Sequence, residues 1–408
     1  MKAALELLAS VRRGELSVVE LVGQQLETLH AVDHSTGAVI AFDDDQVLAH
    51  ARALDDRFAA GEAPGVLHGL PITVKDWIDV VGFPCAGGSE AHQDRRPRED
   101  ATVVRRLREA GAVVLAKTKV GGRAGVKHPL RPERSVGGSS SGEAAVVAGG
   151  GSILGIGSDS GGSVRLPAAW TGVIGLKPTA GLVPTTGHFP RVGSIGDGRT
   201  QIGPMARDLE AVELAVSVMC GVDGRDAGVA PVVMGRSADH TVAGVRFAVL
   251  KEEGRWSATD PFSDAIEVAA SALEEAGALQ VEWPLSDWLG SAYEITQKYW
   301  SRPDRTGEEV YEDLREWDRF RFRYMKGVAS VDLLLTPPVR EVAPEERPIT
   351  GDDFVFTLPA SLTGSPALVV PLMSDDVGLP VAVQVVGRPW QDALVLAAGR
   401  VVVTARRE

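Results

Sequence analysis

Residues 157–169, which read GSDSGGSVRLPAA, restrict the fold of this chain more than any other stretch. Six of the first seven residues are Gly or Ser, and the stretch then turns apolar. Glycine admits backbone conformations that other residues avoid, so such a run is either a flexible loop or a tight bend that aims its groups at one point. A strand pattern, SILGIGSD, runs directly into it, so the loop begins where a strand ends.

Phosphate binding is one chemistry to weigh, because GIGSDSG (155–161) comes close to a dinucleotide fingerprint. That fingerprint must open a helix and be followed by an acidic residue about 20 positions later. Pro167 and Gly172 interrupt any long helix here, and no Asp or Glu lies between Asp159 and Asp197. The sequence also contains no GK[ST] of a Walker A motif, so nucleotide binding is disfavoured.

Acyl transfer by a serine is the second chemistry. GSSSG (138–142) matches the G-x-S-x-G pattern with Ser140 as nucleophile, but HPLRPERSV precedes it where a buried strand is required. A serine nucleophile needs a base, and a lysine serves when burial lowers its pKa. Lys75 is the best candidate because it ends the apolar run LPITV, although most Lys–Asp pairs at strand ends are solvated.

Charge and composition exclude several other classes. The formal net charge of −13 argues against a nucleic-acid partner, which would need a basic patch. The two cysteines, Cys85 and Cys220, lie far apart, so we expect no disulfide framework and a cytoplasmic location. There is no CxxC, and the eight histidines lack metal-ligand spacing, so we expect no metal and no cofactor. The charge-free stretch 144–158 is too short and too Gly-rich to span a membrane.

Hydrophobic periodicity predicts an α/β protein. Residues 1–60 read as helices, with Ser17 as an N-cap and Glu20 three residues later. Further along we expect strands at 69–76, 112–118, 152–159, 171–179, 244–250, 331–338 and 380–388, and helices at 101–110, from about 142, and at 208–220, 260–276, about 289–326 and 391–405. Because the two types are mixed without repeats or an obvious linker, the simplest expectation is one domain over 1–408 with a large mixed sheet.

Three segments together resemble the amidase signature family of serine hydrolases: GLPITVKD at 69–76, GGSSSGEAAVVAGG at 137–150 and GSDSGGSVRLPAAWTGVIGLKPTAGLVP at 157–184. The match continues, in the family's order, through GPMARDLEAV (203–212), FTLPASLTGSPALVVP (356–371) and LPVAVQVVGRPWQDALVL (379–396). The resemblance implies an α/β fold whose large mixed sheet is covered by helices on both faces. It divides the domain into a helical part, a signature core with the catalytic residues and a C-terminal part that completes the sheet and pocket, at 1–60, 69–220 and 221–408.

The resemblance also implies a Lys–Ser–Ser triad. Lys75 would be the base, Ser139 the middle residue held by a cis peptide bond, and Ser163 the nucleophile. The oxyanion that forms during acyl transfer is stabilised by aligned N–H donors. The expected donors are the backbone N–H groups of Ser160, Gly161, Gly162 and Ser163.

Several neighbours receive supporting roles. We expect Asp159 and Arg165 to form an ion pair that braces the nucleophile loop, and Ser140 to form hydrogen bonds within its own loop. Ser158 receives no role. The candidate substrate-binding residues are Gly138 and His188.

The activity implied by the resemblance is hydrolysis of a carboxylic amide to a carboxylate and ammonia or an amine. Two alternatives remain open: a glutaminase or amidotransferase subunit that passes ammonia to a partner protein, and a catalytically silent member that binds or scaffolds. The connection at 119–136 is shorter than usual for the family, and Lys119 stands where Asn is common, which leaves the substrate undefined. We expect a small-molecule amide substrate, no nucleic-acid or membrane partner and, by default, a homodimer.

Overall fold

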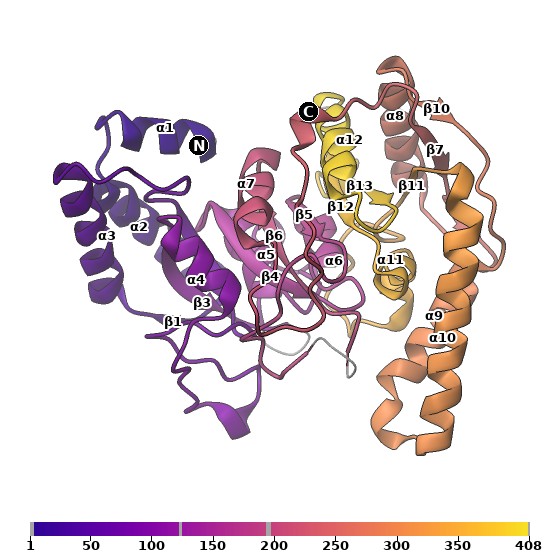
Figure 1. Ribbon diagram of the computed structural model, residues 1–408, viewed down its shortest axis with the longest axis horizontal. Coiled ribbons are helices and arrows are strands. Elements are labelled where there is room, and N and C mark those ends of the chain that lie inside the picture. The colour runs from indigo at the N-terminus through magenta and orange to yellow at the C-terminus, as the bar shows by residue number, and fades with distance from the viewer. Residues whose placement is uncertain (1–3, 122–124, 193–196, 407–408) are drawn as a thin grey trace.

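One eleven-stranded sheet forms the centre of the computed structural model, which describes residues 4–121, 125–192 and 197–406 (Figure 1). The first three residues of the expected N-terminal helix and 122–124 of the short connection at 119–136 therefore lie outside the described residues. The helices are α1 Ala4–Arg12, α2 Val18–Thr36, α3 Asp44–Ala59, α4 Thr102–Glu109, α5 Ser141–Gly149, α6 Arg165–Thr171, α7 Leu209–Met219, α8 Asp260–Glu275, α9 Trp288–Trp300, α10 Gly307–Gly327, α11 Leu358–Thr363 and α12 Asp392–Thr404.

The strands are β1 Val39–Phe42, β2 Pro71–Lys75, β3 Val113–Thr118, β4 Leu154–Asp159, β5 Ile174–Lys177, β6 Gln201–Ala206, β7 Arg246–Val249, β8 Glu252–Glu253, β9 Trp256–Ser257, β10 Leu279–Gln280, β11 Leu333–Thr336, β12 Ala367–Ser374 and β13 Pro380–Gly387. Their order in the large sheet is β1-β3-β2-β4-β6-β5-β12-β13-β11-β7-β10, and β8 and β9 form a separate two-stranded sheet. β2 is parallel to both β3 and β4, whereas the strands from β4 through β6, β5, β12 and β13 to β11 are antiparallel neighbours. The sheet is therefore mixed, as predicted.

Helices cover both faces of this sheet. β6 contacts both α5 and α7, and β13 contacts α6 as well as α8 and α12. α5 packs against α6, while α7 and α8 each pack against α12, which separates two groups of helices. Because both faces are covered, every residue of β2, β3 and β4 is buried, and these strands read as nearly continuous apolar runs.

The N-terminal helices follow the expected local signals. Ser17 caps α2 and forms a capping box with Glu20, and Gly37 ends the helix in the left-handed conformation that glycine adopts without strain. The expectation of helices throughout 1–60 is wrong at Val39–Phe42, which pairs with β3 as an edge strand. This four-residue strand is too short for periodicity to distinguish it from a loop.

The single helix expected at about 289–326 is two helices. α9 ends at Trp300, and a short 3₁₀ turn with Pro303 at its start separates it from α10. Proline lacks the N–H needed to continue a helix, which explains the break. Proline has no such effect at Pro167 in α6, because the first N–H groups of a helix have no intrahelical partner.

Strands from both halves of the chain lie in the same sheet. β5 of the signature core pairs with β12 of the C-terminal part, with Leu176 opposite Leu368. The main hydrophobic core likewise includes residues from α2 to α12. In the described part of the chain, no helix is long and apolar enough to cross a bilayer.

Candidate active site

The site lies at the carboxyl ends of two neighbouring parallel strands. β2 ends at Lys75 and β4 ends at Asp159, and the two strands pair in register from Ile72 opposite Leu154. Parallel strands bring their carboxyl ends to the same edge of a sheet, which is where α/β proteins place their ligands. The topology therefore joins residues that lie more than eighty positions apart in the sequence.

The side chain of Lys75 is fully buried and surrounded by polar groups. Its Nζ lies 2.8 Å from the Oγ of Ser139 and 2.9 Å from the Oγ of Ser140. The carbonyl oxygen and the Oγ of Ser158 each lie 3.2 Å away. The ammonium position also lies 4.2 Å from the centre of the Trp77 ring.

Burial lowers the pKa of Lys75 to about 7, because the charged amine loses its water. Asp159 and Glu143 act in the opposite direction and favour the charged form. A large fraction of Lys75 is therefore neutral at neutral pH, and a neutral amine can accept a proton.

The hydrogen bonds around Lys75 indicate which neighbour can supply that proton. The Oγ of Ser140 donates to the Ser158 carbonyl at 3.3 Å, so it can only accept from the amine. His188 Nδ1 donates to the Pro190 carbonyl at 2.7 Å, so its Nε2 accepts a hydrogen bond from the Ser158 hydroxyl, whose Oγ lies 3.0 Å away. Both hydroxyls are thus committed, and Ser139 is the neighbour left with a proton to give.

Ser139 and Ser163 are half-buried, whereas Lys75 is enclosed. The peptide bond between Gly138 and Ser139 is cis, which agrees with what the resemblance implies for Ser139. The next residue, Ser140, donates its backbone N–H to the carbonyl of Ser163 at 3.1 Å. This contact holds the segment with Ser139 against the loop with Ser163, and both of these residues remain partly exposed.

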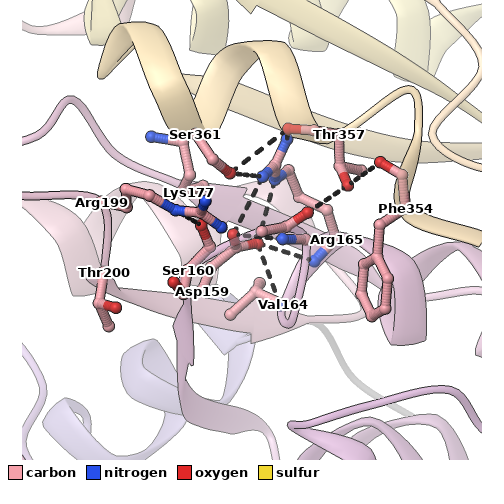
Figure 2. A network of polar contacts seen from close by, with 12 residues as sticks. Asp159, Ser160, Val164, Arg165, Lys177, Arg199, Thr200, Phe354, Thr357 and Ser361 are labelled. Carbon is pink, nitrogen blue, oxygen red and sulfur yellow. Dashed lines mark hydrogen bonds and ion pairs between the residues drawn. The ribbon is translucent and has the colours of Figure 1, made fainter. Parts of the chain in front are cut away.

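The expected ion pair between Asp159 and Arg165 forms beside the loop at 160–163 (Figure 2). Asp159 accepts hydrogen bonds from Arg165 Nε and Nη2 at 3.0 Å each, and from the N–H groups of Gly162 and Val164 at 2.8 and 3.1 Å. Both charged side chains are fully enclosed. Burial alone would raise the pKa of Asp159, but the Arg165 guanidinium lowers it to about 2. Arg165 also donates hydrogen bonds to the carbonyl of Thr357, which precedes α11, and to the side chains of Ser361 in α11 and Gln384 in β13.

The backbone of the loop at 160–163 has all of its carbonyl oxygens engaged. The carbonyl of Ser160 accepts from Arg199 Nε, and that of Gly161 accepts from Thr357 Oγ1. The carbonyls of Gly162 and Ser163 accept from the backbone N–H groups of Leu166 and Ser140, respectively. Among the described residues, the N–H groups of Ser160, Gly161 and Ser163 donate no hydrogen bond. The N–H of Gly162 is already occupied by Asp159, which differs from its predicted place among the four oxyanion donors.

Gly162 instead allows the backbone to bend at this point. Its φ of +135° is rarely adopted by other residues, and a Cβ there would lie 2.3 Å from the Oγ1 of Thr357. The glycine is thus required by both conformation and space.

The two candidate substrate-binding residues are both buried. Gly138 precedes the cis bond, and a pocket of about 200 Å³ adjoins it, lined in part by Gly137, Ser141 and Arg347. His188 is only 5 % exposed, and burial lowers its pKa to about 4, so it is neutral. Its ring contacts Ser158 behind Lys75, which differs from the expectation that it would line the pocket.

Three residues of the site had no role from sequence. Ser158 links Lys75 to His188, and Arg199 donates to the Ser160 carbonyl in the loop at 160–163. Glu143 accepts from the hydroxyls of Thr73 and Thr118 at 2.6 Å each, and burial raises its pKa to about 7. A single acidic residue among the otherwise small or apolar residues of α5 was a signal that could have identified Glu143.

Comparisons with known proteins agree over nearly the whole chain. The family model described as Amidase matches residues 20–301 and 294–396. A glutamyl-tRNA(Gln) amidotransferase subunit of Symbiobacterium thermophilum is 33% identical over 458 aligned positions, which cover 94% of this chain and 92% of that protein. A fatty acid amide hydrolase of Arabidopsis thaliana is 30% identical, with 88% of this chain and 68% of that protein covered.

Solved structures share the same fold. A crystal structure of an amidase aligns with a TM-score of 0.82 and 26% identity, and the alignment covers 100% of both chains. In the described residues, no group of three or more His, Cys, Asp or Glu side chains is arranged to hold a metal ion.

Proposed function

The chain belongs to the amidase signature family and is a hydrolase of C–N amide bonds, and we propose that it works through an acyl-enzyme on Ser163 with Ser139 and Lys75 as a proton relay. The observation that carries the proposal is the enclosed Lys75 amine, 2.8 Å from the Oγ of Ser139. A serine hydroxyl is a weak nucleophile unless a base takes its proton, and a neutral amine is such a base.

In the proposed reaction, neutral Lys75 accepts the proton of Ser139 while Ser139 accepts that of Ser163. The Oγ of Ser163 attacks the amide carbon, and the carbonyl oxygen becomes an oxyanion. The free N–H groups of Ser160, Gly161 and Ser163 are the donors for this oxyanion, and one such donor contributes about 3–4 kcal/mol in other enzymes. The relay then reverses to protonate the departing nitrogen, the C–N bond breaks, and water repeats the sequence on the ester.

Several finer features belong to the same proposal. The substrate is a small amide, the pocket beside Ser139 receives part of it, and no metal or cofactor takes part. We place the protein in the cytoplasm, because two widely separated thiols suit a reducing compartment. We also retain the homodimer as the default assembly.

A fluorophosphonate probe tests the nucleophile without knowledge of the substrate. We expect the folded wild-type protein to be labelled at Ser163 and Ser163→Ala to remain unlabelled, as read by peptide mass. Ser152→Ala is the matched control, because that buried hydroxyl only donates to the Leu154 carbonyl at 2.8 Å. Absence of label on the wild-type protein, or label on a different residue, would overturn the proposal.

A panel of primary amides, anilides and peptide amides then identifies the substrate class. The measured quantity is the ammonia or amine released by the wild-type protein, with Ser163→Ala subtracted as background. Turnover of one class and not the others defines the leaving group.

The similarity to an amidotransferase subunit supports a second candidate function, that of a subunit which releases ammonia for a partner protein. In that case glutamine would be the amide, and the ammonia would pass to a partner protein. Glutamine as the one panel member hydrolysed would favour this alternative, whereas turnover of anilides would favour a free-standing amidase.

A further inference from the structure

Arg199 is a fully buried charged side chain that the proposed reaction does not use. It lies in the segment before β6, where the carboxylate of Asp197 accepts the N–H of Arg199 at 3.1 Å and that of Thr200 at 3.3 Å. Its guanidinium lies 4.2 Å from the ring centre of Tyr299. The backbone and the side chain of Arg199 are thus both held in place.

The side chain of Arg199 is poorly satisfied apart from one bond. Its Nε donates to the carbonyl of Ser160 at 3.1 Å, and its Nη1 reaches the Oγ1 of Thr296 only at 3.5 Å. Its Nη2 is buried without a hydrogen-bond partner. A buried donor without a partner costs about 1–3 kcal/mol, so packing and stability do not explain an arginine here. Besides the contact with the Tyr299 ring, the bond to the Ser160 carbonyl is the feature that an apolar side chain could not supply.

That bond fixes the orientation of one peptide plane (Figure 2). The peptide between Ser160 and Gly161 is planar and trans, so its C=O and its N–H point in opposite directions. With the Ser160 oxygen held by Arg199, the Gly161 N–H must point away from the guanidinium. Gly161 has no side chain to assist, and a Cβ there would lie 3.2 Å from Nη2 of Arg199 and 3.2 Å from the Trp300 ring.

The next peptide, between Gly161 and Gly162, also has its C=O and its N–H on opposite sides. Thr357 holds the carbonyl of Gly161 at 2.5 Å, and on the opposite side of that plane the Gly162 N–H donates to Asp159 at 2.8 Å. The two planes therefore differ in one respect. The N–H opposite Thr357 is occupied by a carboxylate, whereas the N–H opposite Arg199 has no intramolecular acceptor among the described residues.

We propose that Arg199 is a positioning residue of the oxyanion hole, acting through the Ser160 carbonyl to aim the Gly161 N–H at the reacting oxygen. This inference rests on the proposed function, in which Ser163 is the nucleophile. Without the Nε donor the plane is free to rotate, and the Gly161 N–H leaves the position where negative charge develops. Small misplacements of such groups cost up to about a hundredfold in rate.

A matched pair of substitutions isolates the Nε donor. Arg199→Gln places an amide nitrogen at the fourth side-chain atom, where arginine has Nε, whereas Arg199→Met places a methyl group there. Both variants lose the charge and have similar length. We expect the rate constant for fluorophosphonate labelling of Ser163 to fall about tenfold to a hundredfold in Arg199→Met and to stay within about fivefold of wild type in Arg199→Gln.

Two further readouts distinguish positioning from general damage. The pH at which labelling is half-maximal should stay unchanged in Arg199→Met, because Lys75 keeps its surroundings. In hydrogen exchange, peptides that cover residues 159–166 should exchange their amide hydrogens faster in Arg199→Met than in Arg199→Gln. Thr296→Val is the control, because it removes the weak partner of Nη1 and leaves Nε untouched.

The outcomes of this experiment distinguish the positioning role of Arg199 from the proposed function. Equal labelling of Arg199→Met and wild type, or an equal fall in the Met and Gln variants, overturns the positioning role and leaves the proposed function standing. An unlabelled wild-type protein overturns the proposed function, and the positioning role with it.

Discussion

At the scale of single residues, the chemistry of this site depends on the removal of water from one amine. Lys75 has no solvent contact, and the four oxygen atoms within hydrogen-bond distance of its Nζ, from Ser139, Ser140 and Ser158, carry no charge. The nearest carboxylates that favour its charged form, Asp159 and Glu143, are each engaged elsewhere. In the proposed reaction, the balance between burial and these two charges sets the pH at which Lys75 can accept a proton.

The rate of fluorophosphonate labelling should therefore follow the neutral form of Lys75. We expect it to rise about tenfold per pH unit below pH 7 and to level off above it, because the pKa of Lys75 is lowered to about 7. Glu143 also has a pKa near 7, so the wild-type midpoint belongs to the pair. Glu143→Gln removes a negative charge that favours the ammonium form, so its midpoint should move to lower pH.

The matched control for this shift is Glu109→Gln, because Glu109 is the last residue of helix α4 and its side chain is 62% exposed. It should leave the midpoint where it is. A maximum near pH 5 in the wild-type protein, or a shift of Glu143→Gln to higher pH, would contradict a neutral lysine base. Labelling rate against pH from 5 to 9 is the measurement.

How much of the site the sequence predicts follows from how its residues come together. Motif resemblance predicted Lys75, Ser139 and Ser163, because each ends or follows a recognisable segment. It missed Ser158, Glu143 and Arg199, whose roles arise from strand pairing and helix placement that no local pattern specifies. The occupied N–H of Gly162 was equally invisible, since only the bend brings Asp159 back onto it.

At the scale of elements, the loop with the proposed nucleophile connects a strand to a helix and is braced by residues from the far half of the chain. β4 supplies Asp159, α6 begins with Arg165, and the guanidinium continues to α11 and β13. Sequence patterns predicted β4 but not α6, because a seven-residue helix that contains a proline shows little periodicity. They also missed β6 and β12, whose places in the sheet are fixed by pairing with β4 and β5.

Arg165→Met should be one of the most destabilising single changes in this protein. It leaves Asp159 charged and enclosed without its partner, which costs about 3–5 kcal/mol for a buried pair. The midpoint and slope of urea unfolding measure it, with Arg105→Met on the exposed face of α4 as the control. A loss below about 1 kcal/mol, the range of an exposed pair, would show that the pair does not brace the loop.

The same pair predicts a sign for acid unfolding. The pKa of Asp159 is lowered from 3.8 to about 2, so its contribution to stability is complete above pH 4 and is lost as the pH falls toward 2. The shift corresponds to about 2 kcal/mol. In Arg165→Met this loss on acidification should be smaller, because the carboxyl no longer has its partner.

At the scale of the whole molecule, the signature core does not complete its own sheet. β5 uses β12 as its neighbour, and Arg165 needs the carbonyl of Thr357 and the side chain of Gln384. Sequence analysis predicted one mixed sheet over the whole chain, and the structure has it. The order of the strands in the sheet could not be predicted, because β6 lies between β4 and β5 although it follows both of them in the sequence.

Residues 1–220 expressed alone should therefore fail to label at Ser163 and should lack a cooperative unfolding transition. The exposed edge of β5 and the unpaired Arg165 provide the physical reason. The full chain should unfold in one transition by both circular dichroism and Trp fluorescence. A folded fragment 1–220 that reacts with the probe would show that the core is an independent domain.

The two ends of the large sheet have a consequence for the behaviour of the protein in concentrated solution. The sheet stops at β1, which has four residues, and at β10, which has two. An edge strand is a template for pairing with another chain, and very short edges present few open backbone groups for this. An eleven-stranded sheet with such ends resists growth by intermolecular strand addition, so contacts between copies fall to the side chains on its helical surfaces.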